Sequence, residues 1–183
     1  ANEIYFTSGG SESDNWAIKK IMISRMNKGK HMITTKVEHH AVLESCKYLE
    51  SLGFEVTYLN VNKDGLIDLN ELESAIREDT ILVSIMAANN EIGTLMPLKE
   101  IGDICKKHKV LFHTDAVQAY GNIPIDVNEM NIDLLSTSAH KIEGPKGIGF
   151  LYVRKGVMIT PLISGGMQEK GKRAGTTNAA GII

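Results

Sequence analysis

Lys141 stands beside a serine and a histidine, where an apolar segment breaks into a glycine-rich loop. The stretch Ser136–Phe150 reads STSAHKIEGPKGIGF, so Ser138, His140 and Lys141 lie close together along the chain. A lysine in this position is either a solvated surface charge or a nucleophile that forms a Schiff base with a carbonyl compound. The stretch by itself leaves both interpretations open.

A second group of candidate residues lies in the stretch Thr7–Asn15, which reads TSGGSESDN. Its two adjacent glycines allow a tight backbone turn, and a helix that begins there directs free N–H groups toward a bound phosphate. Gly10 and Ser11 are therefore candidate phosphate ligands. The stretch is neither G-x-G-x-x-G nor a P-loop, so an ordinary glycine turn with Ser11 as the helix N-cap is an equally good interpretation.

Asp115 ends the apolar run VLFHTD. An unpaired carboxylate there would be costly, so a cation or a hydrogen-bond donor is expected beside it. A protonated heterocyclic nitrogen would meet this need. The N–H groups of the turn that follows would also meet it, and this is the more conservative interpretation. His39, Asn90 and Gln118 likewise follow predicted strands and carry polar groups able to bind a ligand.

The segments between these residues predict how they are brought together. Strands are expected over 4–8, 31–35, 54–60, 81–87, 109–115, 132–138 and 148–154, and helices over about 15–27, 41–52, 69–76 and 98–108. This alternation predicts an α/β fold of three α-β-α layers, with a mostly parallel mixed sheet covered on both faces. Ligands bind beyond the carboxyl ends of the strands in such sheets, so the candidate residues are expected on one rim.

The composition restricts the function classes. The chain has 183 residues, 43% of them hydrophobic and 23% charged, with a formal net charge of −2. This is an ordinary globular composition, and it argues against nucleic acid as the main partner, because phosphate backbones require a basic face. No apolar run reaches membrane-spanning length and no signal-peptide pattern opens the chain, so no membrane partner is expected. Cys46 and Cys105 fall on apolar helical positions, which predicts buried, reduced thiols and a cytoplasmic location.

Two metal-binding interpretations are weak. One would use three histidines and a carboxylate: His39, His40, His113 and Asp115. No spacing among them places two ligands on one ion, and adjacent residues rarely face the same ion. The other would use Asn60–Glu71, which fits an EF-hand loop at nearly every ligand position. The residues before it alternate as a strand instead of forming the entering helix, so a polar turn with Asp68 capping the next helix is favoured.

A serine acylase of the penicillin-binding type is also suggested, because Ser138–Lys141 matches S-x-x-K and residues 13–15 spell S-D-N. In that family S-x-x-K begins a helix and precedes S-D-N, and K-T-G follows. Here the order is reversed, K-T-G is absent, and Lys141 leads into a Gly-Pro loop. These differences set the acylase interpretation aside.

One cofactor, pyridoxal 5'-phosphate (PLP), uses the whole set of candidate residues. It needs a lysine amine for a Schiff base, a carboxylate for its pyridinium nitrogen, phosphate donors at a helix N-terminus and a group that stacks on its ring. Lys141, Asp115, the turn at Gly10–Ser11 and His39 match these needs. The sequence therefore predicts PLP as the cofactor and no metal.

Six ordered motifs carry a family resemblance: TSGGSESDN, EHHAVL, ANNEIG, HTDAVQ, SAHKIEGPKGIG and QEKGKRAGT. Together they resemble the cysteine desulfurases, in the class V aminotransferase group of fold-type I PLP enzymes. The resemblance covers essentially the whole chain, and it implies the large-domain fold of PLP-dependent transferases over residues 1–183.

The resemblance also implies a role for each candidate. It gives the Schiff base to Lys141, the pyridine nitrogen to Asp115, the phenolic oxygen to Gln118, ring stacking and proton transfer to His39, cofactor contact to Asn90, and the phosphate to Gly10, Ser11, Ser138 and His140. Thr176, in RAGT, resembles the residue that reaches across a homodimer to the neighbouring subunit's phosphate.

The implied reaction converts L-cysteine into L-alanine and an enzyme persulfide, which supplies sulfur to acceptor or scaffold proteins of iron–sulfur cluster assembly. The family's persulfide cysteine and substrate-carboxylate arginine lie downstream of RAGT, and neither Cys46 nor Cys105 fits the former. We therefore expect a PLP-binding large domain that lacks the family's N-terminal segment and C-terminal small domain and is inactive alone. Two alternatives stay open at this point: a related PLP lyase or transferase such as a selenocysteine lyase, and a non-catalytic scaffold.

Overall fold

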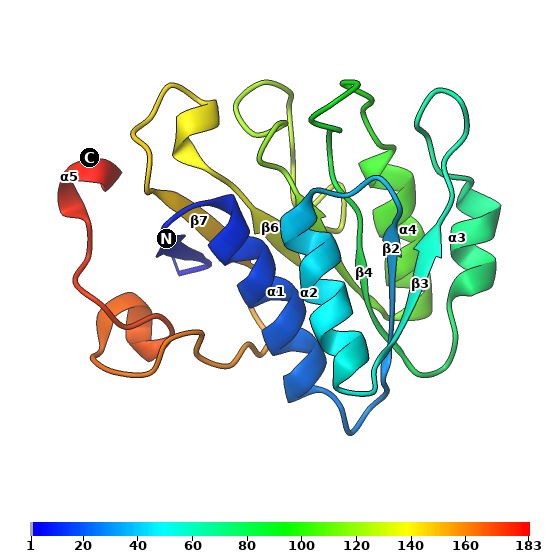
Figure 1. Ribbon diagram of the computed structural model, residues 1–183, viewed down its shortest axis with the longest axis horizontal. Coiled ribbons are helices and arrows are strands. Elements are labelled where there is room, and N and C mark those ends of the chain that lie inside the picture. Colours follow the sequence, from blue (N-terminus) through cyan, green and yellow to red (C-terminus); the bar gives the residue numbers. More distant parts are fainter. Residues whose placement is uncertain (1) are drawn as a thin grey trace.

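The computed structural model describes residues 2–183, which form a seven-stranded sheet with helices on both faces (Figure 1). The strands are β1 (Ile4–Thr7), β2 (His31–Thr35), β3 (Glu55–Leu59), β4 (Thr80–Ser84), β5 (Leu111–Asp115), β6 (Leu134–Ser136) and β7 (Gly149–Val153). The helices are α1 (Gly10–Ser24), α2 (His40–Ser51), α3 (Leu69–Ala75), α4 (Leu98–His108) and α5 (Ala179–Ile182), with short 3₁₀ turns η1 (Ala139–Lys141) and η2 (Gln168–Gly171).

The strand order is β1-β7-β6-β5-β4-β2-β3. Neighbours from β3 to β6 are parallel, whereas β7 is antiparallel to both β6 and β1. Because β7 is antiparallel to both of its neighbours, β1 runs in the same direction as β6. The carboxyl end of β1 therefore lies on the same rim as that of β6. The predicted mostly parallel mixed sheet is therefore confirmed.

Apolar side chains cover the sheet on both faces. Trp16 from α1 and Leu49 from α2 belong to one buried cluster, together with Leu82 of β4. Ile101 from α4 belongs to the other cluster, together with Val83, the next residue of the same strand. Adjacent residues of β4 thus enter opposite layers, as the alternation of a strand requires, and both layers of helices are held by buried apolar area.

The start of α1 differs from the prediction, which placed it near residue 15. The helix begins at Gly10, where the Ser13 N–H donates to the Gly9 carbonyl at 3.1 Å. Gly9 is the N-cap, with φ of 145°, so the interpretation of Ser11 as N-cap is wrong. The first turn is polar because it faces the rim, and apolar periodicity therefore gives no signal for it.

The segment with the EF-hand pattern is a polar turn, as expected. Strand β3 precedes it, and Asp68 caps α3 by accepting a hydrogen bond from the Asn70 N–H at 2.8 Å. No helix within residues 2–183 has the length and apolar character needed to cross a membrane.

Candidate active site

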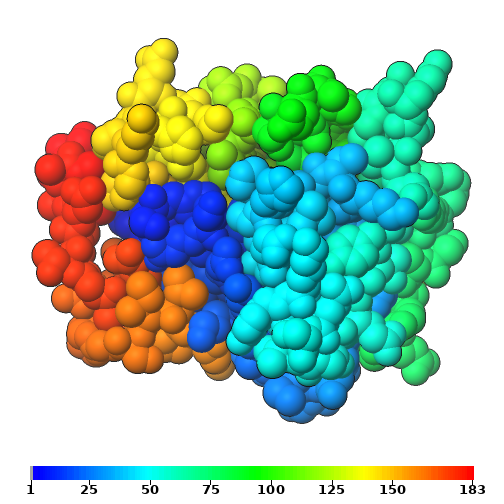
Figure 2. All heavy atoms as spheres, viewed as in Figure 1, coloured from blue at the N-terminus to red at the C-terminus, as the bar shows by residue number. Residues whose placement is uncertain are grey.

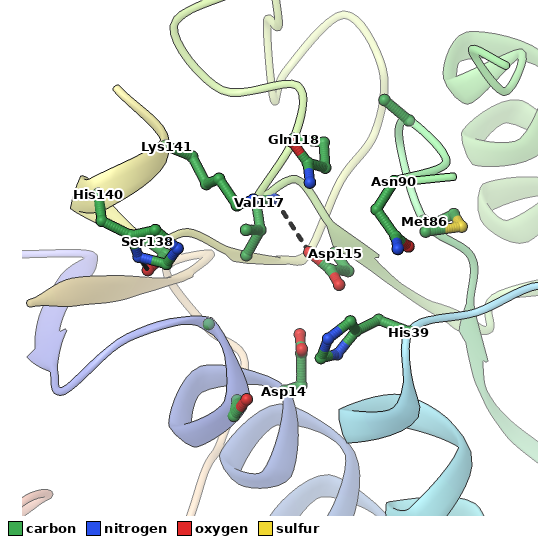
Figure 3. A pocket seen from close by; sticks show the side chains of 13 residues that line it. Asp14, His39, Met86, Asn90, Asp115, Val117, Gln118, Ser138, His140 and Lys141 are labelled. Atoms are coloured by element: carbon green, nitrogen blue, oxygen red, sulfur yellow. Dashed lines mark hydrogen bonds between the residues drawn. The ribbon is translucent and has the colours of Figure 1, made fainter. Parts of the chain in front are cut away.

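A pocket of about 260 Å³ lies at the rim where the carboxyl ends of the parallel strands meet (Figure 3). It is lined by Gly10, Ser11, Asp14, His39, Met86, Ala88, Asn90, Asp115, Val117, Gln118, Ser138, His140 and Lys141. These include every candidate PLP-binding residue named from the sequence except Thr176. Five separate segments contribute, so the topology of the sheet brings the site together.

Asp115 closes the floor of the pocket at the end of β5, with 6% of its surface exposed. Its Oδ1 accepts a hydrogen bond from the Val117 N–H at 2.9 Å (Figure 3). The turn thus donates a hydrogen bond to one carboxyl oxygen of Asp115, as the conservative interpretation expected. It does not engage the other carboxyl oxygen. Burial raises the pKa of Asp115, while the Val117 N–H and His39 act to lower it.

His39 overlies this carboxyl from the N-terminus of α2. Its Nδ1 accepts a hydrogen bond from the Ala41 N–H at 3.1 Å, which makes His39 the side-chain cap of the helix. Because a backbone N–H occupies the Nδ1 lone pair, the neutral ring carries its proton on Nε2. The ring orientation is therefore fixed by the helix, and its remaining polar atom in the neutral form is a donor.

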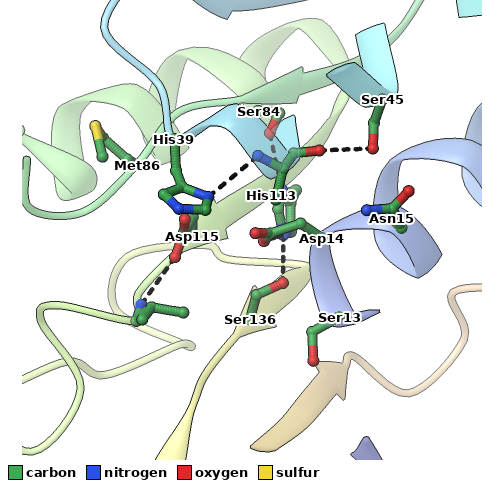
Figure 4. Close-up of polar contacts among 12 residues, drawn as sticks. Ser13, Asp14, Asn15, His39, Ser45, Ser84, Met86, His113, Asp115 and Ser136 are labelled. Carbon is green, nitrogen blue, oxygen red and sulfur yellow. Dashed lines mark hydrogen bonds and ion pairs between the residues drawn. The ribbon is translucent and has the colours of Figure 1, made fainter. Parts of the chain in front are cut away.

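The structure does not assemble the metal set considered from the sequence. His113 is wholly buried, between the Ser84 hydroxyl at 2.8 Å and the Ser136 hydroxyl at 2.9 Å (Figure 4). A different trio, Asp14 with His39 and Asp115, has ligand atoms within 4.8 Å of one another. A metal would need a free imidazole lone pair, whereas the Nδ1 of His39 accepts from Ala41 and the Nε2 of the neutral ring bears a proton. The trio therefore does not present the imidazole lone pair that a metal centre needs.

Two glycines open the other end of the pocket. A Cβ on Gly10 would collide with the Val117 side chain, and Gly9 has a φ that side chains rarely adopt. The first N–H groups of α1 have no partner inside the helix, and their alignment with the helix dipole favours an anion at this end. The Ser138 hydroxyl, 2.8 Å from the Nδ1 of His140, lies on the same side. This end has the donors that a phosphate needs.

Lys141 ends the 3₁₀ turn η1, and its side chain extends toward the pocket (Figure 3). Within residues 2–183 its amine has no hydrogen-bond or ion-pair partner. The turn is tight, because the Gly144 N–H donates to the Ala139 carbonyl at 2.9 Å, where a Cβ on Gly144 would lie 2.9 Å from the Ala139 Cβ. The glycine-rich loop thus directs an unengaged amine at the pocket.

Thr176 is exposed and lies apart from the other candidates, in a smaller cavity of about 120 Å³ with Glu169 and Arg173. The segment around it packs against the N-terminal residues: Arg173 pairs with Glu12 at 2.8 Å, and Glu169 accepts from the Phe6 N–H at 2.9 Å. Figure 2 shows this orange-to-red segment beside the dark-blue start of the chain. The structure does not bring Thr176 to the pocket of its own chain.

Known proteins resemble this chain over nearly its full length. The profile of the family described as aminotransferase class-V matches residues 1–183. The chain belongs to the aminotransferase class-V family. It is 64% identical, over 100% of its length, to cysteine desulfurase IscS of Methanosarcina thermophila, and it covers 45% of that protein. The corresponding enzyme of Clostridium botulinum is 60% identical, with 46% of its length covered.

Solved structures of similar sequence share the fold. The structure titled "SspA in complex with cysteine" superposes with a TM-score of 0.96 at 49% identity, covering 99% of this chain and 53% of that one. A NifS-like protein gives a TM-score of 0.96 at 50% identity, covering 99% of this chain and 50% of that one. The chain spans about half the length of the curated relatives it matches.

Sequence reasoning missed four lining residues of this class-V aminotransferase pocket: Asp14, Met86, Ala88 and Val117. Asp14 is the chemically important one, because it is a carboxylate with 1% of its surface exposed. A signal for it did exist. Residues four apart share a helix face, so a helix beginning at Gly10 places Asp14 beside the same pocket.

Proposed function

We propose that this chain is the cofactor-binding part of a PLP-dependent cysteine desulfurase, with L-cysteine as its substrate. The observation that carries the proposal is the convergence of Lys141, Asp115 and the first turn of α1, at Gly10 and Ser11, in one pocket. The high identity to proteins named cysteine desulfurase supports it, as does a structural neighbour whose title includes cysteine.

The residues present fit PLP at three points. The floor has buried carboxyl groups, with Asp14 Oδ1 lacking a partner in the described structure, which suits a cationic ring nitrogen. At Gly10 the absence of a side chain lets the start of α1, with its free N–H groups, lie close against Val117 at the pocket wall. The amine of Lys141 is available for a Schiff base. When bound, PLP supplies an electron sink that stabilises negative charge on the substrate α-carbon.

The chain's own residues would divide the remaining work. The Asp115 oxygen not engaged by the turn would accept the ring N–H, and the ring of His39 would cover one face. Ser11, Ser138 and His140 would hold the phosphate with the N–H groups of α1, while Gln118 and Asn90 would donate from the rim. Lys141, once displaced by the substrate amine, would move the proton at the substrate α-carbon.

Sulfur transfer needs an accessible thiolate, and the two cysteines of the sequence do not supply one. Cys46 and Cys105 are buried, and burial raises the pKa of each thiol to about 12. Only the thiolate attacks sulfur. We therefore propose that this chain alone holds the cofactor without accepting sulfur. A second copy bringing Thr176, and an acceptor protein of iron–sulfur assembly, would be its partners.

The test is titration of the purified chain with PLP, followed by visible absorbance, borohydride reduction and mapping of the modified lysine. We expect one saturable site with the label at Lys141, abolished in Lys141→Ala. Lys155→Ala is the matched control, because Lys155 is exposed and lines neither the main pocket nor the adjoining hollow at the proposed phosphate end. Label at Lys155, or spread over surface lysines, would contradict the proposal.

A further inference from the structure

Three carboxyl groups lie at and beneath the floor of the pocket: Asp14 from α1, Glu38 from the loop after β2 and Asp115 from β5. Their exposed fractions are 1%, 6% and 6%. Figure 3 shows the carboxyl groups of Asp14 and Asp115 pointing toward one another, and their oxygens are within 4.8 Å. Three buried carboxyl groups so placed cannot all be ionised without a compensating positive charge.

The three groups differ in the donors that face them. Glu38 accepts from the Thr35 hydroxyl at 2.8 Å and the Met86 N–H at 3.0 Å, and Asp115 accepts from the Val117 N–H. Asp14 Oδ1 has no hydrogen-bond partner in the described structure. Hydrogen bonds from N–H groups favour the ionised form, so within the facing pair Asp115 is ionised and Asp14, which has fewer such donors, keeps its proton.

No fixed cation compensates them in residues 2–183, where no lysine or arginine lies within salt-bridge distance of the three. His113 Nε2 is 3.7 Å from Asp14 Oδ1, but burial lowers the pKa of His113 to about 3, so this ring is neutral (Figure 4). Burial, then Asp115 and Glu38, raise the pKa of Asp14 well above its ordinary value, while Ser136 acts to lower it. His39, His140 and Lys141 are the other titratable groups lining the same pocket.

We propose that Asp14 is a positioning residue that gives up its proton when the cationic ring of PLP binds beside it. In the cofactor-free chain, Asp14 holds a proton beside the Asp115 carboxylate. When the ring nitrogen reaches Asp115, the O–H bond of Asp14 breaks and its electron pair stays on the carboxylate. The proton forms the N–H bond of an unprotonated ring, or leaves to solvent if the ring arrives protonated. When the ring arrives unprotonated, the summed charge of Asp14, Asp115 and the ring is −1 both before and after the proton transfer.

This exchange rests on the proposed function, and it predicts how many protons the chain releases when PLP binds. Wild-type chain should release about one more proton per PLP bound than Asp14→Asn, which has none to give. The apparent PLP affinity should accordingly rise with pH more steeply in the wild type, by up to about tenfold per pH unit. A merely structural role of Asp14 would weaken PLP binding in the variant. It would change neither the number of protons released nor the pH dependence of the PLP affinity.

The experiment is isothermal titration of the full chain with PLP at about pH 7.5, in two buffers of different ionisation enthalpy. Lys141-dependent absorbance is recorded in parallel. Glu38→Gln is the matched control, a second buried carboxyl removed isosterically, and it should release as many protons as the wild type. Asp14→Ser, in which a smaller hydroxyl side chain takes the place of the carboxyl, is used if Asp14→Asn does not fold.

Equal proton release in wild type and Asp14→Asn, with binding intact, would overturn the exchange and leave the proposed function standing. A change confined to Glu38→Gln would overturn it also, by placing the proton on Glu38. Absence of Lys141-dependent absorbance in the wild type would overturn the proposed function, and the exchange with it. About one fewer proton released by Asp14→Asn, with Glu38→Gln unchanged, is the expected result.

Discussion

Replacing Glu38 by glutamine should stabilise the chain at high pH, because the wild-type carboxyl is held in its neutral form. Its Oε1 accepts the hydrogen bonds from Thr35 and Met86, while Oε2 has no partner in the described structure. Burial raises the pKa of Glu38 from its ordinary 4.5 to about 8, against the effect of those two donors. Glutamine has the same shape and stays neutral at every pH.

The magnitude follows from the two pKa values. A folded chain with the higher pKa holds the proton more tightly than the unfolded chain does. The resulting stabilisation is complete below 4.5 and is lost as the pH rises through about 8. A difference of one in pKa corresponds to about 1.4 kcal/mol. The wild type should therefore lose about 3 kcal/mol of unfolding free energy relative to Glu38→Gln between about pH 5 and about pH 8. For this chain length the melting temperatures would then diverge on the order of 10 °C.

The assay is urea unfolding followed by circular dichroism, at a series of pH values from about 5 to about 8. The other buried carboxyl groups are common to both proteins, so the difference between the curves isolates Glu38. Glu71→Gln, at an exposed position of α3, is the control and should follow the wild type. Parallel curves for wild type and Glu38→Gln would refute the reasoning, because they would mean that Glu38 ionises in the folded chain as it does in the unfolded one.

Two further predictions concern the glycine turn and the thiols. Gly10→Ala should weaken PLP binding and cost about 1–3 kcal/mol of unfolding free energy, because its Cβ would collide with the Val117 side chain. PLP titration measures the first effect and urea unfolding the second. An unchanged PLP affinity would contradict the role of the first turn of α1 in binding the phosphate. Cys46 and Cys105 should react with a thiol reagent such as DTNB in unfolded chain and only very slowly in folded chain, because both are buried with a raised pKa; rapid reaction of the folded chain would count against the assignment of these thiols as inert.

Much of the site followed from the sequence because polar residues after strands meet at one rim of a parallel sheet. Asp115, His39 and Lys141 each follow an apolar segment, and the pocket contains all three. The beginning of α1 was misplaced because its first turn is polar, and Asp14 was missed with it. The metal set failed for another reason: His113 is on a strand face where two serines hold its ring, inside the protein and away from the rim.

The order of the residues is enough to predict the fold class, the rim on which the pocket lies and most of the side chains that line it. Those features depend on local periodicity and on residue type, which any reader of the chain can see. That order does not predict that Asp14, Glu38 and Asp115 are buried together in the fold, with no lysine or arginine of residues 2–183 paired with them. Protonation of these carboxyl groups depends on distance and desolvation between segments far apart in sequence, and neither quantity is written in the order of the residues.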